Sequence, residues 1–357
     1  MVQPRRNLLQ IVLLLAILTV GIIVSAVYFL QQTQILDSPQ TPDPPQIQNP
    51  QQLPKTPEDV ELSLIGEIDT GGHALSVHVN GDLAFVTDYG ESTAHGLIIV
   101  NVSNPSQPEI LGEYHDGGFP YAIESVGEIV YIADEVEGLR VIDISDPTHP
   151  LEIEGFGGSG MAFDLEIVGD FLFLADYEWG MVVLDISIPS NPEYVASFGP
   201  DCFHFEIEEN IAYIAGAGRL RTVNVSDPHN PTLLGQTIAS SITLWDPSVS
   251  NGTVYLANHS GDDGELLIYD ARNPSNIQKI GEFDSAGTFQ SFFVDHSLLY
   301  AVDFVSGLYV LDVTNATLPL EIERFSDGQP WDVTICDGLV YLVGSEGLQI
   351  LEATYIY

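Results

Sequence analysis

Short apolar runs separated by turn-forming residues make up the chain from about residue 60 onward. Four such runs follow one another at Phe163–Val168, Phe171–Ala175, Met181–Ile186 and Glu193–Phe198, with Gly, Asp, Asn and Pro between them. Those residues favour turns. The second and third runs are almost continuously apolar, which predicts strands that are covered on both faces.

One phrase recurs through this region, and its clearest copy runs from Gly138 to Pro147 as Gly-Leu-Arg-Val-Ile-Asp-Ile-Ser-Asp-Pro. The seven copies are separated by 42, 42, 39, 46, 42 and 40 residues and begin at Gly96, Gly138, Gly180, Arg219, Glu265, Gly307 and Gly347. A period near forty residues with four short strands in each unit is typical of propeller blades. The sequence therefore predicts an all-β fold, a seven-bladed β-propeller of four-stranded antiparallel blades.

The recurring phrase resembles the LVIVD repeat family, which is found in surface proteins of bacteria and archaea. The resemblance covers about residues 60–357 and implies a propeller, but it implies no catalytic activity. The chain departs from the family pattern at four positions: Asn101, Asn224 and Glu352 in the Asp column, and Ala316 in place of the turn proline.

The Asp of the phrase stands just before a turn in four of the copies, at Asp143, Asp185, Asp270 and Asp312. A short acceptor side chain at such a position holds the amides of the following turn. Because the position recurs in most units, we interpret these carboxylates as architectural and not catalytic.

The ends of the repeat region are complementary. Residues Val60 to Ile68 match the fourth-strand phrase seen at Pro108 to Tyr114, while the last unit ends just after its third strand, at Leu348 to Leu351. We therefore predict that the N-terminal strand completes the seventh blade and closes the ring without a disulfide. The two cysteines, Cys202 and Cys336, fall in different units and are not expected to pair.

A long apolar segment precedes the repeats. Its 23 residues, Leu8 to Leu30, would cross the hydrocarbon layer of about 30 Å as a helix. Arg5 and Arg6 precede the segment and no basic residue follows it until Lys55, so the positive-inside rule places the rest of the chain outside the cell. We predict an uncleaved anchor; cleavage after Ala26 would instead secrete the protein.

The segment after the anchor is rich in proline and glutamine, with seven prolines and eight glutamines between residues 31 and 57. This composition favours extended polyproline II. The predicted organisation is a cytoplasmic tail (1–7), a transmembrane anchor or signal segment (8–30), an extended linker (31–59) and a propeller (60–357) that faces the extracellular side.

The chain is strongly acidic, with 51 Asp and Glu against 9 Lys and Arg and a formal net charge of −42. Such a surface repels phosphate backbones, which argues against nucleic acid as a partner. Two interpretations stay open: the acidity keeps an extracellular domain soluble, or it serves a specific role with cations.

Alignment of the repeats places aromatic and acidic residues at the start of each first strand. The aromatic column is Leu75, Tyr121, Phe163, Phe203, Trp245, Gln290 and Trp331, and the next is Ser76, Ala122, Asp164, His204, Asp246, Ser291 and Asp332. Two residues further along the first strand, the repeats carry His78, Glu124, Glu166 and Glu206. The turns between the second and third strands add Asp88, Asp134, Asp176, Asn258 and Asp303 on the same face. The candidate ligand-binding residues are Tyr121, Phe163, Asp164, His204, Trp245, Asp246, Trp331 and Asp332.

These columns have two interpretations. They are packing between blades with acids on a solvated rim, or they form a pocket for a sugar, an extracellular protein or peptide, or a cation. We predict a monomeric, non-catalytic binding module with no cofactor; calcium at the oxygen-rich loop of residues 258–265 is a weaker alternative. The competing function is a hydrolase or lyase that uses a channel metal held by residues such as Asp164, Glu166, Glu206 and His204.

Overall fold

The computed structural model describes residues 59–356, except for 90–94, 116, 136, 158–160, 217, 239–243 and 260–263. The described residues belong to one compact unit, residues 55–357. The predicted anchor and almost all of the predicted linker lie outside the described residues. Within the described part of the chain, no helix has the length and apolar character needed to span a membrane.

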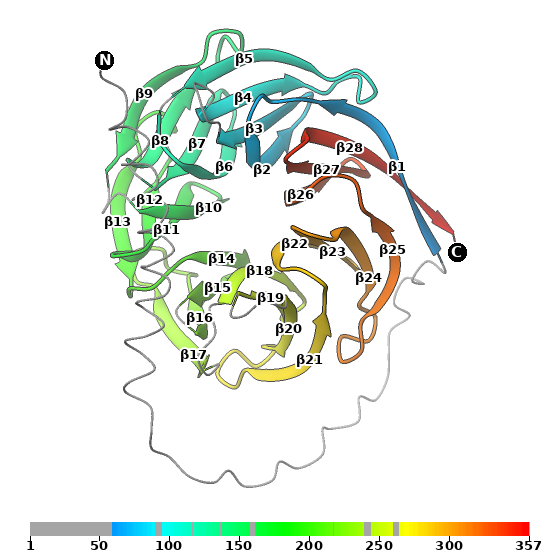
Figure 1. The fold of residues 1–357 in the computed structure, drawn as a ribbon. Coiled ribbons are helices and arrows are strands. Elements are labelled where there is room, and N and C mark those ends of the chain that lie inside the picture. Colours follow the sequence, from blue (N-terminus) through cyan, green and yellow to red (C-terminus); the bar gives the residue numbers. More distant parts are fainter. Residues whose placement is uncertain are drawn as a thin grey trace, which may run out of the picture. The chain divides into compact units, whose positions relative to one another are not determined.

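The described chain forms seven four-stranded antiparallel sheets arranged as a ring (Figure 1). Blade 1 comprises β2 (His73–Asn80), β3 (Leu83–Tyr89), β4 (His95–Asn101) and β5 (Glu109–His115). Blade 2 comprises β6 (Pro120–Val126), β7 (Ile129–Asp134), β8 (Gly138–Asp143) and β9 (Leu151–Phe156). Blade 3 comprises β10 (Ala162–Val168), β11 (Phe171–Asp176), β12 (Gly180–Asp185) and β13 (Glu193–Phe198). Blades 4 and 5 comprise β14 (His204–Glu208), β15 (Ile211–Gly216), β16 (Arg219–Asn224), β17 (Thr232–Ile238); and β18 (Leu244–Ser250), β19 (Thr253–Asn258), β20 (Glu265–Asp270), β21 (Gln278–Asp284). Blades 6 and 7 comprise β22 (Phe289–Asp295), β23 (Leu298–Asp303), β24 (Gly307–Asp312), β25 (Leu320–Phe325); and β26 (Pro330–Cys336), β27 (Leu339–Gly344), β28 (Gly347–Ile356), β1 (Asp59–Ile68). The all-β, seven-bladed prediction is confirmed.

The ring closes between the two ends of the described chain. Strand β1 pairs antiparallel with β28, so that Ile68 lies opposite Leu348 and Asp59 lies opposite Ile356. Figure 1 shows β1 and β28, blue beside red, completing the seventh sheet. The predicted closure is confirmed, and Cys202 and Cys336 are free. Both ends of the described chain therefore lie in blade 7, at the end of the strands opposite the turn between β27 and β28.

The hydrophobic core lies between neighbouring blades. One cluster joins Tyr131 and Val141 of blade 2 to Leu172 and Val182 of blade 3, and all four are fully buried. The middle strands of each blade are covered on both sides, which explains their continuous apolar sequence. Blade-to-blade packing thus replaces the helices that cover the sheet in α/β proteins.

The recurring phrase acts as a turn and as a contact with the preceding blade. The Asp143 carboxylate accepts a hydrogen bond from the Ser145 amide at 2.8 Å, and Asp185, Asp270 and Asp312 do the same two residues downstream. The architectural interpretation of these residues is supported. The turn then lies against the fourth strand of the blade before it: a Cβ at Gly112 would lie 2.2 Å from the Pro147 carbonyl oxygen.

Candidate functional site

The aromatic column coincides with a β-bulge in the first strand of most blades. In blade 3 the register shifts between Ala162 and Asp164, which leaves Phe163 as the extra residue. The same shift isolates four other members of the column: Leu75, Tyr121, Gln290 and Trp331. A bulge changes the direction of a side chain and frees it from the regular pleat. Five of the strands that line the centre of the ring in Figure 1 therefore carry an irregular position at the aromatic column.

Five rings from consecutive blades contact one another to form what we call the aromatic arc. It consists of Tyr121, Phe163, Phe203, Trp245 and His259, with centroid separations of 5.2, 5.6, 5.9 and 5.2 Å along the series. Phe163 is buried and the other four are half-buried. The arc thus combines packing across blades 2 to 5 with ring surface that remains accessible. Trp331 lies outside this series and contacts Phe304 of blade 6 at 5.8 Å.

The inner-strand carboxylates join adjacent blades through the main chain. Each first strand has one edge bonded to its own blade, so the amides on its other edge need a separate acceptor. Carboxylates of a neighbouring blade supply it at 2.6–3.0 Å: Asp164 to Phe205, Glu166 to Ile207, Glu206 to Val249, Asp246 to Phe292 and Asp332 to Val77. The acids that sequence analysis placed around the channel are therefore held in a shared backbone network.

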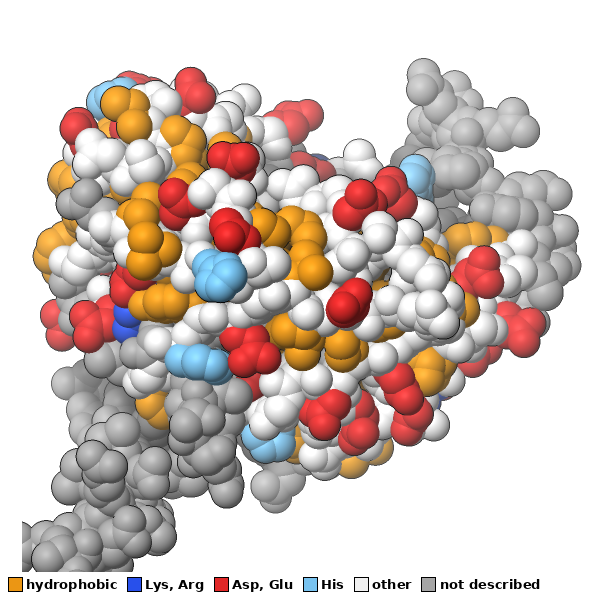
Figure 2. Space-filling view, turned by 90° about the horizontal axis from the view of Figure 1, so that it is seen from above, with side chains coloured by type: hydrophobic (Ala, Val, Ile, Leu, Met, Phe, Trp, Pro, Cys, Tyr) orange, Lys and Arg blue, Asp and Glu red, His pale blue; other side chains and the backbone are white. Residues whose placement is uncertain are grey.

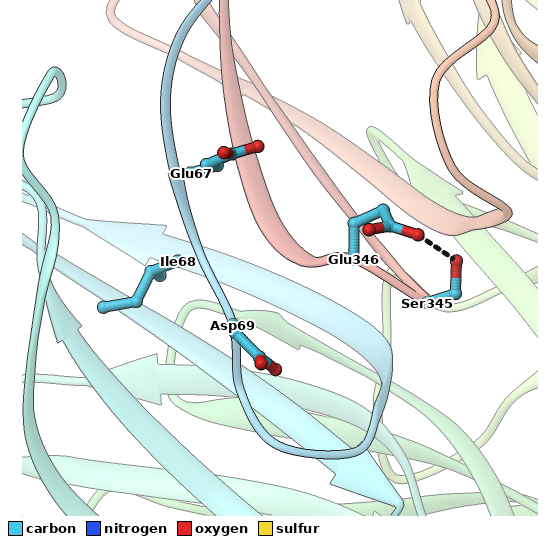
Figure 3. Close-up of a pocket in the computed structure, with 5 residues that line it drawn as sticks. All are labelled: Glu67, Ile68, Asp69, Ser345 and Glu346. Atoms are coloured by element: carbon cyan, nitrogen blue, oxygen red, sulfur yellow. Dashed lines mark hydrogen bonds between the residues drawn. The ribbon is translucent and has the colours of Figure 1, made fainter.

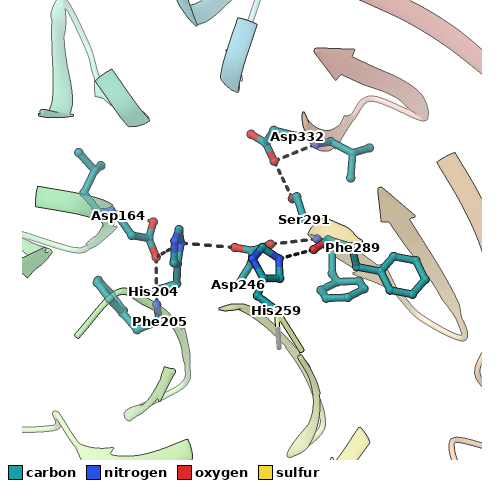
Figure 4. A network of polar contacts seen from close by, with 11 residues as sticks. Asp164, His204, Phe205, Asp246, His259, Phe289, Ser291 and Asp332 are labelled. Carbon is teal, nitrogen blue, oxygen red and sulfur yellow. Dashed lines mark hydrogen bonds and ion pairs between the residues drawn. The ribbon is translucent and has the colours of Figure 1, made fainter. Parts of the chain in front are cut away.

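His204 lies between two of these carboxylates (Figure 4). Its Nδ1 atom is 3.8 Å from an oxygen of Asp164 and 3.8 Å from an oxygen of Asp246. Its ring centroid lies 4.3 Å from that of Trp245, with the two planes tilted by 50°. Its Nε2 atom is buried without a hydrogen-bond partner. Asp332 lies further along the network, where it accepts from the Ser291 hydroxyl at 2.7 Å. Three of the four predicted polar site residues are thus in direct contact, and the fourth is linked by a serine.

Burial shifts the protonation of this network toward the neutral forms. Desolvation raises the pKa of Asp164 to about 7 and that of Glu206 to about 8. It raises the pKa of Glu124 to about 8, where the Asp164 charge adds to the effect, and lowers the pKa of His204 to about 3. Near neutral pH these three carboxyl groups are therefore partly or largely protonated and the His204 ring is uncharged, which reduces the mutual repulsion expected of clustered carboxylates.

The acids at the turns between second and third strands have an architectural role. Asp134, Asp176 and Asp303 are fully buried. The Asp176 carboxylate accepts from the Glu178 and Trp179 amides at 3.0 and 2.8 Å, and that of Asp303 accepts from the Val305 and Ser306 amides. These carboxylates cap the turns and so face inward instead of toward a ligand.

An acidic hollow lies at the seam where the ring closes (Figure 3). It has a volume of about 490 Å³ and is lined by Glu67, Ile68, Asp69, Ser345 and Glu346. Figure 2 shows acidic side chains spread over one side of the molecule, with hardly any Lys or Arg among them. Within the described ranges, no three His, Cys, Asp or Glu side chains are grouped so as to hold a metal ion. The loop considered for calcium lies partly outside those ranges.

Sequence reasoning brought Tyr121, Phe163 and Trp245 to one surface but did not single out two further members of the arc. Phe203 stood in the aromatic column and is the ring that connects Phe163 to Trp245. His259 follows the second strand of blade 5, and its Nε2 atom lies 2.6 Å from the Phe289 carbonyl oxygen. Its position in an oxygen-rich loop suggested a cation site, so its role as an aromatic partner was missed.

Comparison with known proteins identifies the repeat and the fold. The model of the LVIVD repeat matches residues 71–116, 123–156, 159–199, 205–237 and 286–327. No curated protein matches the chain. Among solved structures, Sqt1 from Saccharomyces cerevisiae is similar at 12% identity, covering 82% of this chain and 99% of its own, with a TM-score of 0.59. The computationally designed protein Ika8 is similar at 9% identity (82% and 99% covered, TM-score 0.57), and BamB from Moraxella catarrhalis at 12% (82% and 98%, TM-score 0.53). At these identities the similarity concerns the fold alone.

Proposed function

The chain belongs to the LVIVD repeat family, and from this premise we propose that it is a non-catalytic binding or adhesion module. In this proposal a single propeller is held outside the cell by the apolar segment of residues 8–30. The aromatic arc is the ligand-binding surface. The proposal rests on the family, on the apolar segment and on the geometry of the aromatic arc.

The observation that carries the proposal is that the channel acids bind the protein's own main chain, whereas the aromatic rings keep exposed surface. The inner-strand carboxylates accept hydrogen bonds from the main chain of neighbouring blades. A carboxylate in that position is poorly placed to act as a general acid or base on a substrate. The rings of Tyr121, Phe203 and Trp245 are only half-buried, which leaves aromatic surface for a ligand.

The chemistry of the arc favours neutral or cationic ligands. Aromatic faces bind the apolar faces of sugar rings and attract cationic groups. Anionic ligands would meet the charge of a chain with 51 acidic and 9 basic residues. The ligand class that we propose is therefore an extracellular carbohydrate or a basic peptide segment, with no nucleic acid.

The entry point of the chain into the propeller supports presentation of this surface. Strand β1 begins at Asp59, which pairs with Ile356, whereas the turns beside the aromatic arc are at the other end of the strands. The described chain thus enters β1 at the end of the blade opposite the arc-bearing face. A tethered propeller would thus offer its arc away from the point of attachment.

Binding by the full-length protein in detergent tests the proposal. We would screen it against arrays of neutral oligosaccharides and basic peptides and then compare Trp245→Ala with Trp331→Ala. Truncation of a central aromatic anchor weakens binding by about tenfold or more, so we expect that loss from Trp245→Ala. If only Trp331→Ala weakens binding, the binding site lies at blade 7 and not at the aromatic arc.

Melting temperature measured on the same variants separates binding from packing. If Trp245→Ala keeps full affinity for the captured ligand but melts several degrees lower, the arc is packing and the proposal is wrong. If it loses affinity with a melting temperature close to that of the parent protein, the arc is the binding surface.

A further inference from the structure

A second aromatic group lies on the outer rim, where blade 2 meets blade 3. We call Phe156, Trp179 and Tyr194 the rim cluster. Phe156 stands at the end of β9, Trp179 in the β11–β12 turn and Tyr194 on β13. Phe156 is 6.0 Å from Trp179 and 6.2 Å from Tyr194, and Trp179 is 6.5 Å from Tyr194, measured between ring centroids. The three rings therefore contact one another across two blades.

The rim cluster is exposed to an unusual degree for its size. Trp179 is 43% exposed and Tyr194 is 51% exposed. The planes of Phe156 and Tyr194 are nearly parallel, at 11°, and the Trp179 ring stands at 74° and 86° to them. An arrangement of one ring upright against two parallel rings presents both a face and an edge to solvent. Large aromatic side chains exposed together mark interaction sites more often than single exposed apolar residues do.

Local hydrogen bonds hold two of the rings in place. The Trp179 amide donates to the Asp176 carboxylate at 2.8 Å, which fixes the turn that carries the indole. The Tyr194 hydroxyl donates to the Ser197 hydroxyl at 3.3 Å, along its own strand. Because the rings are ordered by the fold, they would lose little conformational entropy when a ligand binds.

The charged side chain exposed in the turn that carries Trp179 is acidic. No Lys or Arg occurs between Arg140 and Arg219, a stretch that includes all of blade 3. Glu178 precedes Trp179 in the β11–β12 turn, and it is exposed. Electron-rich ring faces beside carboxylates attract cations, and guanidinium groups also stack on Trp and Tyr.

From these contacts and charges we propose that the rim cluster is a docking site for a protein segment that presents arginine or lysine side chains. The positive groups lie over the Trp179 and Tyr194 rings, with the Glu178 carboxylate as a counter-charge. This inference rests on the proposed binding function and names its partner class, but it uses a surface separate from the aromatic arc. The charge complementarity favours a basic protein segment over a neutral sugar.

Titration of the full-length protein with fluorescein-labelled hexa-arginine, followed by anisotropy at about 150 mM salt, tests the proposal. The variant Trp179→Ala/Tyr194→Ala retains every charge, so non-specific attraction to the acidic chain is unchanged. We expect its affinity for the peptide to fall by about tenfold, as for loss of paired aromatic anchors. The matched control is Leu318→Ala/Leu320→Ala, which removes side chains that are 73% and 62% exposed on blade 6 and should leave the affinity unchanged.

Three outcomes would overturn the inference. One is equal affinity of the parent protein and the Trp179→Ala/Tyr194→Ala variant, since charge alone would then explain the binding. Another is an equal loss in the blade 6 control. The third is displacement of the peptide by neutral cellohexaose that itself requires Trp179 and Tyr194, which would identify a sugar site. The variant Trp245→Ala should keep hexa-arginine affinity, so failure of the aromatic arc and failure of the rim cluster are distinguishable.

Discussion

The carboxylate of Glu206 performs a task that a neighbouring strand performs in an ordinary sheet. It accepts a hydrogen bond from the Val249 amide of the next blade at 2.6 Å, and Glu166 does the same for Ile207. Seven inner strands around a channel leave one row of amides on each blade without a partner strand. Acidic residues of the preceding blade satisfy amides of this kind on β2, β14, β18 and β22, so part of the acidity of the chain is structural.

At the residue scale, the protonation of Glu206 makes stability depend on pH. Burial raises its pKa from an ordinary value of 4.5 to about 8 in the folded protein. The folded state therefore binds more protons than the unfolded state between these values, and stability falls as pH rises through this window, by up to about 1.4 kcal/mol per pH unit for each such group. Below pH 4.5 that stability is fully present.

Thermal melts at pH 5 to 9 measure this effect. Glu206→Gln keeps an oxygen for the Val249 amide but removes the titration, so its melting temperature should decline less with pH than that of the parent protein. Glu193→Gln removes the same charge from an exposed position and serves as the control. Parallel curves for the parent and Glu206→Gln would contradict the assignment.

At the scale of elements, the fourth strand of one blade and the turn of the next form a repeated contact. Gly112 on β5 lies against Pro147, and Gly235 on β17 lies against Pro274. The close approach leaves no room for a side chain. The Gly of the fourth-strand phrase and the Pro of the turn phrase are thus two parts of one interface.

Substitution of Gly112 tests this interface. An alanine Cβ would lie 2.2 Å from the Pro147 carbonyl oxygen, so the main chain must move, and overpacking of this kind costs about 1–3 kcal/mol. Gly157→Ala is the matched control, because nothing lies within 4 Å of its Cβ. Urea unfolding should show a lower midpoint for Gly112→Ala only. Equal midpoints for both variants would mean that the blades separate enough to admit a methyl group.

The strands were predictable because their signals are local. The third blade was expected at Phe163–Val168, Phe171–Ala175, Met181–Ile186 and Glu193–Phe198, and the observed strands differ by at most one residue at either end. Turn residues and apolar runs specify such elements within one repeat. The hydrogen bonds between blades join residues far apart in the sequence, such as Asp164 and Phe205 or Asp246 and Phe292. They depend on how adjacent blades are offset. No sequence pattern within one repeat predicts how far one blade is displaced relative to the next.

The rim cluster escaped the sequence analysis for a related reason. Phe156, Trp179 and Tyr194 occupy three different positions of the repeat, so no aligned column brings them together. Their proximity arises only when β9 of one blade lies beside β13 of the next. Aligned repeat positions show only the features that the blades have in common. A surface formed by one particular pair of blades can be recognised only in the folded structure.

At the scale of the whole molecule, the proposed topology places everything after the apolar segment outside the cell. Protease added to intact cells should release a fragment that begins within residues 31–59, because an extended proline-rich linker is accessible and a propeller is compact. Immunoblotting with an antibody against the propeller and N-terminal sequencing of the fragment would measure this. Full-length protein recovered from the soluble cytoplasm would contradict the topology.

The pairing of β1 with β28 also determines how the ring responds to mechanical force. In the proposed topology, a tether at Asp59 would pull along the axis of β1, while a ligand bound on the opposite face would anchor the rest of the ring. The nine residue pairs between the two strands then bear the load together in shear, instead of opening one after another as in a zipper. Resistance to forced unfolding is set by the rate of strand separation, and a shear geometry slows it. The seam that closes the ring would thus be the strongest point of attachment for a protein that holds a ligand under tension.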